Sequence, residues 1–292
     1  MEQRDPKPGP KPSEDVPVQR YPGVEGKMEP AADHGEKSYR GSGKLDGLVA
    51  IVTGGDSGIG RAVCLAFARE GADVAVGYLA EKEDADAEET KRWVEEAGRR
   101  CLLHRFDVQS RAECQRFVER VTSDLGRLDV LVNNAAYQMS RKSIEEYTEE
   151  QVERTFRTNI FGYFYMAQAA MPHLKPGAAI INTGSITGMD GNPELLDYSG
   201  TKGAIHAFTK ALAANVAEKG IRVNCVAPGP VWTPLIPSTF DHEHVVEFGT
   251  DTVWKRPAQP AEIAPAYVFL ASADARYITG EIIAITGKSG TR

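Results

Sequence analysis

The sequence predicts an α/β protein with a single doubly wound parallel sheet of about seven strands and helices on both faces. Two observations lead to this prediction. From Leu45 onward, short apolar runs alternate with helical stretches along the 292-residue chain. A glycine-rich turn also follows the first apolar run and opens the first helix, as is typical of doubly wound sheets. A chain of this length can bury one large core.

The apolar runs have the length and composition of strands that are buried on both faces of a sheet. They are expected as strands at residues 48–53, 72–78, 101–106, 128–133, 178–183, 221–227 and 282–285. Helical patterns separate most of them. Val63, Ala66 and Phe67 recur at helical spacing after the first run, and residues 81–97 read as a charged helix. We find no internal repeat.

Residues 1–43 differ in composition from the rest of the chain. They hold seven of the 17 prolines and almost no large aliphatic residues, so they cannot form a core of their own. We therefore divide the chain into a proline-rich extension, 1–43, and a catalytic domain, 44–292. The extension is either a loose tail or an arm on the body or on a neighbouring subunit, with Tyr21-Pro22-Gly23 and Tyr39 as candidate anchors.

Bulk composition excludes several classes of protein. The 34 basic and 41 acidic residues give a net charge of −7, which disfavours nucleic-acid binding. No apolar run has membrane-spanning or signal-peptide length. The four cysteines lack C-x-x-C spacing and are typical of free thiols in a reducing cytoplasm. His242 and His244 suggest a metal site, but no third ligand is evident, so we expect no metal.

The turn Thr53-Gly54-Gly55-Asp56-Ser57-Gly58-Ile59-Gly60 joins the first strand to the first helix. Glycines let a backbone approach a pyrophosphate closely, and the N-terminus of a helix offers free N–H groups and a positive dipole end. This context predicts a dinucleotide-binding turn. A chance glycine-rich turn is the plainer alternative.

Tyr198 and Lys202 stand four residues apart before an alanine-rich helical run. On a helix they project from the same face. A nearby ammonium stabilises a phenolate, so Lys202 is expected to lower the pKa of Tyr198 and make it an acid/base. Taken alone, the pair also fits an ordinary helix surface.

Several motifs in one order resemble the short-chain dehydrogenase/reductase family over residues 45–287. The glycine turn matches its cofactor turn. Asn133-Asn134-Ala135-Ala136 matches its Asn-Asn-Ala-Gly element, with Ala136 in place of the last glycine. The segment 228–233, Pro-Gly-Pro-Val-Trp-Thr, matches its nicotinamide-side loop. The resemblance implies a Rossmann fold and a catalytic set of Asn159, Ser185, Tyr198 and Lys202.

The resemblance also implies a role for each matching residue. Tyr198 donates the proton in reduction, Ser185 orients the substrate oxygen, Lys202 holds the nicotinamide ribose, and Asn159 supports a proton relay. The residues implied in binding the dinucleotide are Gly54, Asp56, Ser57, Gly58, Ile59, Gly60, Tyr78, Asp107, Val108, Asn133, Ala135, Tyr198, Lys202, Pro228, Gly229, Val231 and Thr233.

The cofactor is expected to be NADP or NAD, with a lean toward NADP. Tyr78 stands where NAD-specific relatives carry an acid. Arg61 and Lys82 are the candidate partners of a 2′-phosphate. Because enoyl-reductase relatives place the lysine seven residues after the tyrosine, the four-residue spacing favours exchange between a carbonyl and an alcohol.

The substrate is expected to be a small aldehyde, ketone, diketone or polyol, as in bacterial aldehyde reductases and glucose-dehydrogenase-like members. The resemblance further implies a homotetramer. The alternatives are a non-catalytic dinucleotide sensor, a methyltransferase on a similar sheet, and an interaction protein that works through residues 1–43.

Overall fold

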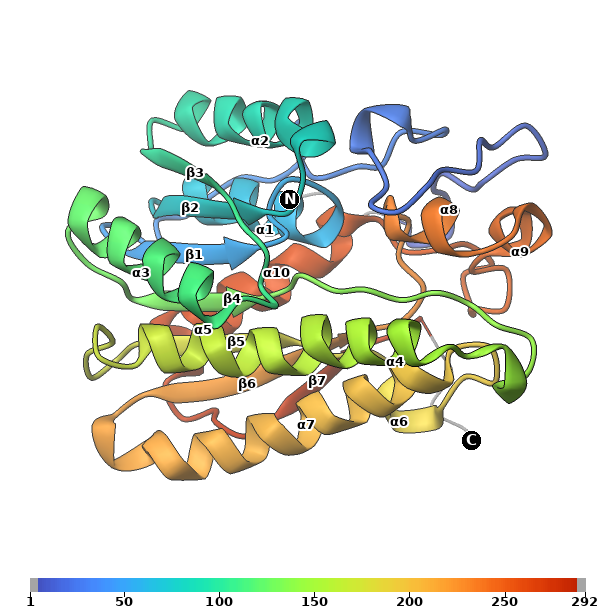
Figure 1. Cartoon of the computed structure of the whole chain (residues 1–292). Coiled ribbons are helices and arrows are strands. Elements are labelled where there is room, and N and C mark those ends of the chain that lie inside the picture. Colours follow the sequence, from blue (N-terminus) through green and yellow to red (C-terminus); the bar gives the residue numbers. More distant parts are fainter. Residues whose placement is uncertain (1–4, 288–292) are drawn as a thin grey trace.

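The computed structural model describes residues 5–287, which fold around a seven-stranded parallel sheet (Figure 1). The strand order is β3-β2-β1-β4-β5-β6-β7. All seven predicted strands are confirmed, with bounds shifted by two residues at most. They are β1 (Val49–Thr53), β2 (Asp73–Tyr78), β3 (Cys101–Arg105), β4 (Val130–Asn133), β5 (Ala179–Thr183), β6 (Arg222–Pro228) and β7 (Ile282–Ile285).

Helices cover both faces of the sheet. They are α1 (Gly58–Arg69), α2 (Asp84–Glu96), α3 (Arg111–Leu125), α4 (Glu149–Phe156), α5 (Gly162–Ala170), α6 (Thr187–Asp190), α7 (Leu196–Val216), α8 (Leu235–Thr239), α9 (His242–Glu247) and α10 (Pro260–Ala271). The π-helical turn η4 (Arg157–Phe161) joins α4 to α5.

The core consists of two main layers, one on each face of the sheet. On one face, Phe67 of α1 packs with Val94 of α2 and Tyr267 of α10. On the other, Phe117 of α3 packs with Met166 of α5 and Val216 of α7. Figure 1 shows α3, α5 and α7 together along that second face. Successive side chains of each strand point to opposite faces of the sheet and so contribute to both core layers, as the near-continuous apolar runs predicted.

The order of the strands positions the site. The chain moves outward from β1 through β2 to β3, then returns to the other side of β1 and continues from β4 to β7. All strands run parallel, but the side on which successive strands are added to the sheet changes between β1 and β4. The loops that follow β1 and β4 therefore separate at the carboxyl ends of these strands. Ligands of open α/β sheets bind in the crevice at such a point.

Residues 5–43 form an irregular arm against the body, interrupted by the 3₁₀ turn η1 (Glu25–Lys27). Val16 and Met28 are buried in a small core with Trp232 and Phe240. Tyr39 donates a 2.6 Å hydrogen bond from its hydroxyl to Glu70 Oε1. The loose-tail alternative therefore does not describe this segment. Packing on a neighbouring subunit stays a prediction. Within residues 5–287, no helix is long and apolar enough to cross a membrane.

Candidate active site

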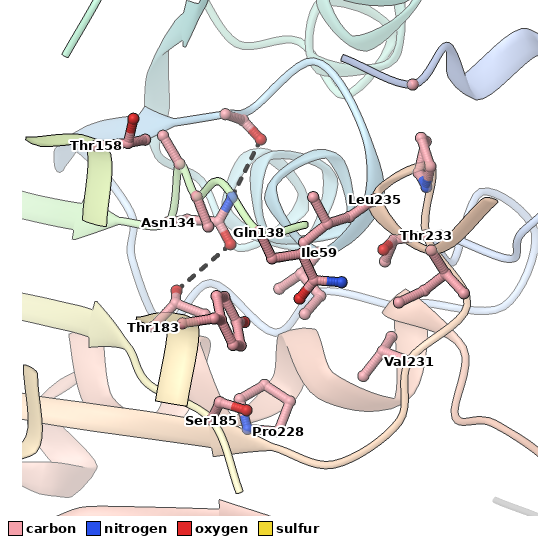
Figure 2. A pocket seen from close by; sticks show the side chains of 18 of the residues that line it. Ile59, Asn134, Gln138, Thr158, Thr183, Ser185, Pro228, Val231, Thr233 and Leu235 are labelled. Atoms are coloured by element: carbon pink, nitrogen blue, oxygen red, sulfur yellow. Dashed lines mark hydrogen bonds between the residues drawn. The ribbon is translucent and has the colours of Figure 1, made fainter. Parts of the chain in front are cut away.

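A cavity of about 440 Å³ opens at the carboxyl ends of β1, β4, β5 and β6. Its walls are the glycine turn after β1, the loop after β4, the segment after β5 and residues 228–236. Figure 2 shows Ser185 and Pro228 on one side of this space and Ile59, Thr233 and Leu235 on another. Ligand sites of enzymes are cavities of this size, in which apolar walls carry a few polar groups.

The glycine turn is packed too closely to hold side chains at two of its glycines. Gly58 begins α1 with a φ of 49°, and a Cβ there would lie 2.9 Å from Thr233 Cγ2. A Cβ on Gly60 would lie 1.9 Å from the Gly54 carbonyl oxygen, so only glycine lets α1 start so close to β1. The side-chain amide of Asn134 donates to the carbonyls of Thr53 and Gly54 and fixes the turn. Figure 2 shows Asn134 bonded to Thr183 as well.

Tyr198 and Lys202 lie on one face of α7, as predicted, and both are buried. Lys202 Nζ lies 5.2 Å from the centre of the Tyr198 ring and donates a 2.7 Å hydrogen bond to the Thr183 carbonyl. Burial lowers the pKa of Lys202 to about 8. Tyr198, Lys202 and Ser185 all line the cavity.

The predicted lowering of the Tyr198 pKa is wrong. Burial raises the pKa of the phenol above its ordinary value, and a hydrogen bond with Ser185 only partly opposes this. The sequence showed the ammonium four residues away, but not that the ring is removed from water. The phenol is thus held in its protonated form, which suits a proton donor.

Asn159 lies in the π-helical turn between α4 and α5 and is fully buried. Its amide bonds both backbone groups of Tyr137 at 2.8 Å and donates to Thr201 Oγ1 at 3.0 Å. Because π-helical turns are frequent at functional sites, this one marks Asn159 as more than a helix-end residue. Thr201 is the residue before Lys202, so Asn159 connects the loop after β4 to α7.

Two carboxylates face the far end of the cavity. Asp56, from the glycine turn, is buried, and its Oδ2 has no hydrogen-bond partner among residues 5–287. Glu83 lies beside it. Burial raises the pKa of Asp56 to about 6. Burial and the Asp56 charge raise the pKa of Glu83 to about 8. An acceptor left unpaired in a cavity is suited to a ligand hydroxyl.

Asp107 and Val108 line this end of the cavity, together with Tyr78. The Asp107 carboxylate accepts from the backbone and the side chain of Gln109, at 2.9 and 3.2 Å. It therefore shapes its own turn. The cap of α3 is Ser110, whose hydroxyl accepts from the Glu113 N–H. Ser110, and not Asp107, therefore caps α3.

Most of the predicted cofactor residues line the cavity, including Ile59, Ala135, Pro228 and Val231. Asn133 does not. Asn133 is fully buried in β4 and donates to Asn182 of β5. Its neighbour Asn134 lines the cavity instead. Gly60 and Asn159 also lie behind the walls. They act through backbone packing and through hydrogen bonds.

The two predicted partners of a 2′-phosphate are not at the cavity. Arg61 is buried and donates to the carbonyls of Asp56 and Asp86. Lys82 Nζ donates to the Arg20 carbonyl at the surface. Neither lines the cavity. Sequence position suggested both residues, but buried acceptors and the arm engage them.

Two segments that the sequence analysis did not place at the cavity also line it. Tyr21, Pro22 and Gly23 of the arm line it, as does Arg154 of α4. The available signal for the arm was its Tyr-Pro-Gly anchor. No feature of the sequence indicated Arg154, because its approach to the cavity depends on how α4 packs.

His242 and His244, which suggested a metal site in the sequence, have separate partners. His242 Nε2 lies 2.9 Å from the Glu14 carbonyl. His244 stacks on Phe240 and lies 3.4 Å from Glu194. His244 lines the cavity.

Comparison with known proteins decides the family. Residues 54–287 match the family model described as "Enoyl-(Acyl carrier protein) reductase". The chain belongs to the short-chain dehydrogenase/reductase family. It is 50% identical to a glucose and ribitol dehydrogenase of Daucus carota, over 90% of this chain and 91% of that one. It is 48% identical to "NADPH-dependent aldehyde reductase 1, chloroplastic" of Arabidopsis thaliana, over 90% and 93%.

Solved structures agree. A short-chain dehydrogenase from Burkholderia cenocepacia in complex with NADP superposes with a TM-score of 0.77 at 30% identity, over 84% of this chain and 98% of that one. The protein is an NAD(P)-dependent oxidoreductase of the short-chain family that interconverts a carbonyl and an alcohol. The non-catalytic alternatives are not favoured.

Proposed function

We propose that Tyr198 is the proton donor and acceptor of the reaction. The nicotinamide supplies or takes the hydride when bound. Ser185 holds the substrate oxygen. Lys202 binds the nicotinamide ribose and passes the proton that resupplies Tyr198. The observation that carries this assignment is the meeting of three buried polar groups, Ser185, Tyr198 and Lys202, on one wall of the cavity.

Asn159 is proposed as the support of the proton relay, since it bonds Thr201 beside Lys202. At the other end, Asp56, Ser57, Tyr78, Asp107 and Val108 are proposed to hold the adenosine half, and Pro228, Gly229, Val231 and Thr233 the nicotinamide half. All nine line the cavity, which supports both assignments.

The proposed substrate is a small aldehyde, ketone or diketone, or a polyol in the reverse direction, and it carries further polar groups, as a sugar does. Near Ser185 the walls combine Gln138, Thr187 and Asn192 with apolar Leu195 and Phe240. Gln138 Nε2 already donates to Thr239 Oγ1, which fixes its orientation. The names of the carrot and Arabidopsis relatives support this substrate class.

The dinucleotide is proposed to be NADP in preference to NAD. The Arabidopsis relative is named as NADPH-dependent and the Burkholderia structure holds NADP. No acid stands at the end of β2 to repel a 2′-phosphate, because Tyr78 occupies that position.

Absorbance of the reduced nicotinamide tests these proposals. Purified protein is mixed with NADPH or NADH and with aldehydes, ketones, diketones and sugars, with Tyr198→Phe as the control. Signal loss with one cofactor and one substrate class is expected. Binding of cofactor with no turnover on any member of the panel would contradict the proposed substrate class.

The protein is also proposed to be a cytoplasmic homotetramer with a catalytic domain at 44–292 and an extension at 1–43. Phe156, Phe161 and Phe164 are exposed along α4, η4 and α5, which supports association through that face. All four cysteines are free, which supports a reducing compartment. Light scattering after size-exclusion chromatography measures the mass, and a monomer would contradict the assembly.

A further inference from the structure

The arm crosses the cavity beside the glycine turn, at the end that we call the phosphate end because the diphosphate is predicted to bind there. Tyr21 donates a 3.1 Å hydrogen bond from its hydroxyl to the Ala136 carbonyl in the loop after β4. Gly23 packs so closely on Pro234 that a Cβ would lie 2.3 Å from the Pro234 carbonyl oxygen. Glu25 accepts from the Gly58 N–H at the start of α1. These three contacts lie on three different walls, so residues 21–25 bridge the opening above the glycine turn.

Arg154 meets the arm at this point. Its guanidinium lies 4.9 Å from the centre of the Tyr21 ring and 4.4 Å from the centre of the Tyr137 ring. The two rings meet edge to face, with centres 4.8 Å apart. Cation–π contacts of this kind hold a guanidinium in place and leave its N–H edges free.

No carboxylate lies within ion-pair distance of Arg154 among residues 5–287, and its side chain has no hydrogen bond there. Of the described residues that line the cavity, only Arg154 and Lys202 are lysine or arginine. Lys202 already donates to the Thr183 carbonyl at the catalytic end. Arg154 is thus the cation available to the phosphate end.

A bound dinucleotide brings negative charge to an end of the cavity that already holds Asp56 and Glu83. The two candidate partners of the 2′-phosphate do not help, because Arg61 and Lys82 donate to backbone carbonyls and do not line the cavity. Guanidinium groups bind phosphate oxygens through paired, charge-assisted hydrogen bonds. An unpaired arginine at this end therefore complements the ligand in charge and in geometry.

We propose that Arg154 binds a phosphate of the dinucleotide and that Tyr21 of the arm is the residue that positions it. The phosphate is either the diphosphate bridge, present in both NAD and NADP, or the 2′-phosphate, present in NADP alone. This inference rests on the proposed use of a dinucleotide and adds to it a part for the N-terminal extension in cofactor binding.

Titration of full-length protein with NADPH and with NADH, followed by quenching of tryptophan fluorescence, tests Arg154. Arg154→Met keeps the packing on the rings and removes the charge, and Arg154→Lys keeps the charge. We expect Arg154→Met to raise Kd about tenfold or more and Arg154→Lys to restore part of the loss. Arg157→Met is the matched control, because Arg157 pairs with exposed Glu153 and does not line the cavity.

The two cofactors separate the two phosphates. Equal weakening of NADH and NADPH assigns the diphosphate, and weakening of NADPH alone assigns the 2′-phosphate. An Arg154→Met protein that binds both cofactors as tightly as Arg157→Met does would overturn the inference. Wild-type protein that binds neither cofactor would instead contradict the proposed function.

Tyr21→Leu tests the positioning role against Tyr39→Leu, since Tyr39 anchors the same arm away from the cavity. We expect Tyr21→Leu to weaken NADPH severalfold with little change in kcat, and Tyr39→Leu to leave Kd unchanged. Thermal unfolding of both variants reports their stability. If Tyr39→Leu weakens NADPH as much as Tyr21→Leu does, docking of the arm alone explains the effect and the positioning role is refuted.

Discussion

Glu25 of the arm accepts a 2.7 Å hydrogen bond from the backbone N–H of Gly58, the first residue of α1. Its carboxylate also lies 3.2 Å from His34 Nε2. Burial alone would raise the pKa of Glu25, but His34, Arg61 and the Gly58 N–H together lower it. A buried ion pair from the extension is thus attached to the turn predicted to hold the diphosphate.

The pH dependence of stability follows from His34. Burial by itself lowers the pKa of this imidazole, but Glu25 and Glu36 raise it to about 9. Because the folded-state pKa exceeds the unfolded value near 6.5, the stabilisation is complete below about pH 6.5 and is lost as pH rises through about 9. We expect the free energy of unfolding to fall by up to about 3 kcal/mol over that interval.

Denaturant unfolding at several pH values measures this loss. His34→Gln should remove the part of the pH dependence that His34 contributes between about pH 6.5 and 9, and His242→Gln, at the surface, should keep it. An unchanged slope in His34→Gln would show that another group titrates.

Tyr198→Phe should lower kcat by roughly 10²–10⁴-fold, because it removes the proton that the substrate oxygen exchanges. The dissociation constant of NADPH should change little, since the ring remains. Tyr277→Phe is the control, as Tyr277 is fully exposed. Steady-state kinetics and fluorescence titration measure the two effects, and full turnover in Tyr198→Phe would refute the mechanism.

Lys202→Met should stabilise the cofactor-free protein while it abolishes turnover. Burial lowers the pKa of Lys202 to about 8. Below that pH the folded state therefore carries a buried ammonium, which is less stable there than in water in the unfolded chain. The gain should be at most roughly 3 kcal/mol below pH 8 and should fade toward about pH 10.5. The Thr183 carbonyl keeps its bond from Tyr163. A lower melting temperature at pH 7 would contradict this expectation.

Asp56→Asn should shift cofactor preference toward NADPH. The substitution removes a carboxylate that repels phosphate at the adenosine end and also weakens an acceptor for ribose hydroxyls. The ratio of the Kd for NADH to that for NADPH should therefore rise. Asp251→Asn, at the other end of the cavity, is the control. A fall in the ratio would mean that Asp56 does not face the ribose.

Local patterns in the sequence were sufficient to predict the sheet and the shared helix face of Tyr198 and Lys202. Apolar runs such as residues 178–183 have one stable environment, the interior of a parallel sheet, and β5 lies there. The four-residue step from Tyr198 to Lys202 specifies a shared helix face whatever surrounds the helix. The glycines of the turn likewise follow from backbone sterics, which are local.

Only the tertiary structure decided which charges reach the cavity and how burial changes them. Arg61 and Lys82 had suitable positions in the sequence, yet buried carbonyls and the arm engage them, while Arg154 arrives from α4. The pKa of Tyr198 rises instead of falling, because desolvation depends on everything packed around the ring. Side-chain reach, burial and the docking of residues 5–43 are long-range properties, and no short stretch of sequence contains them.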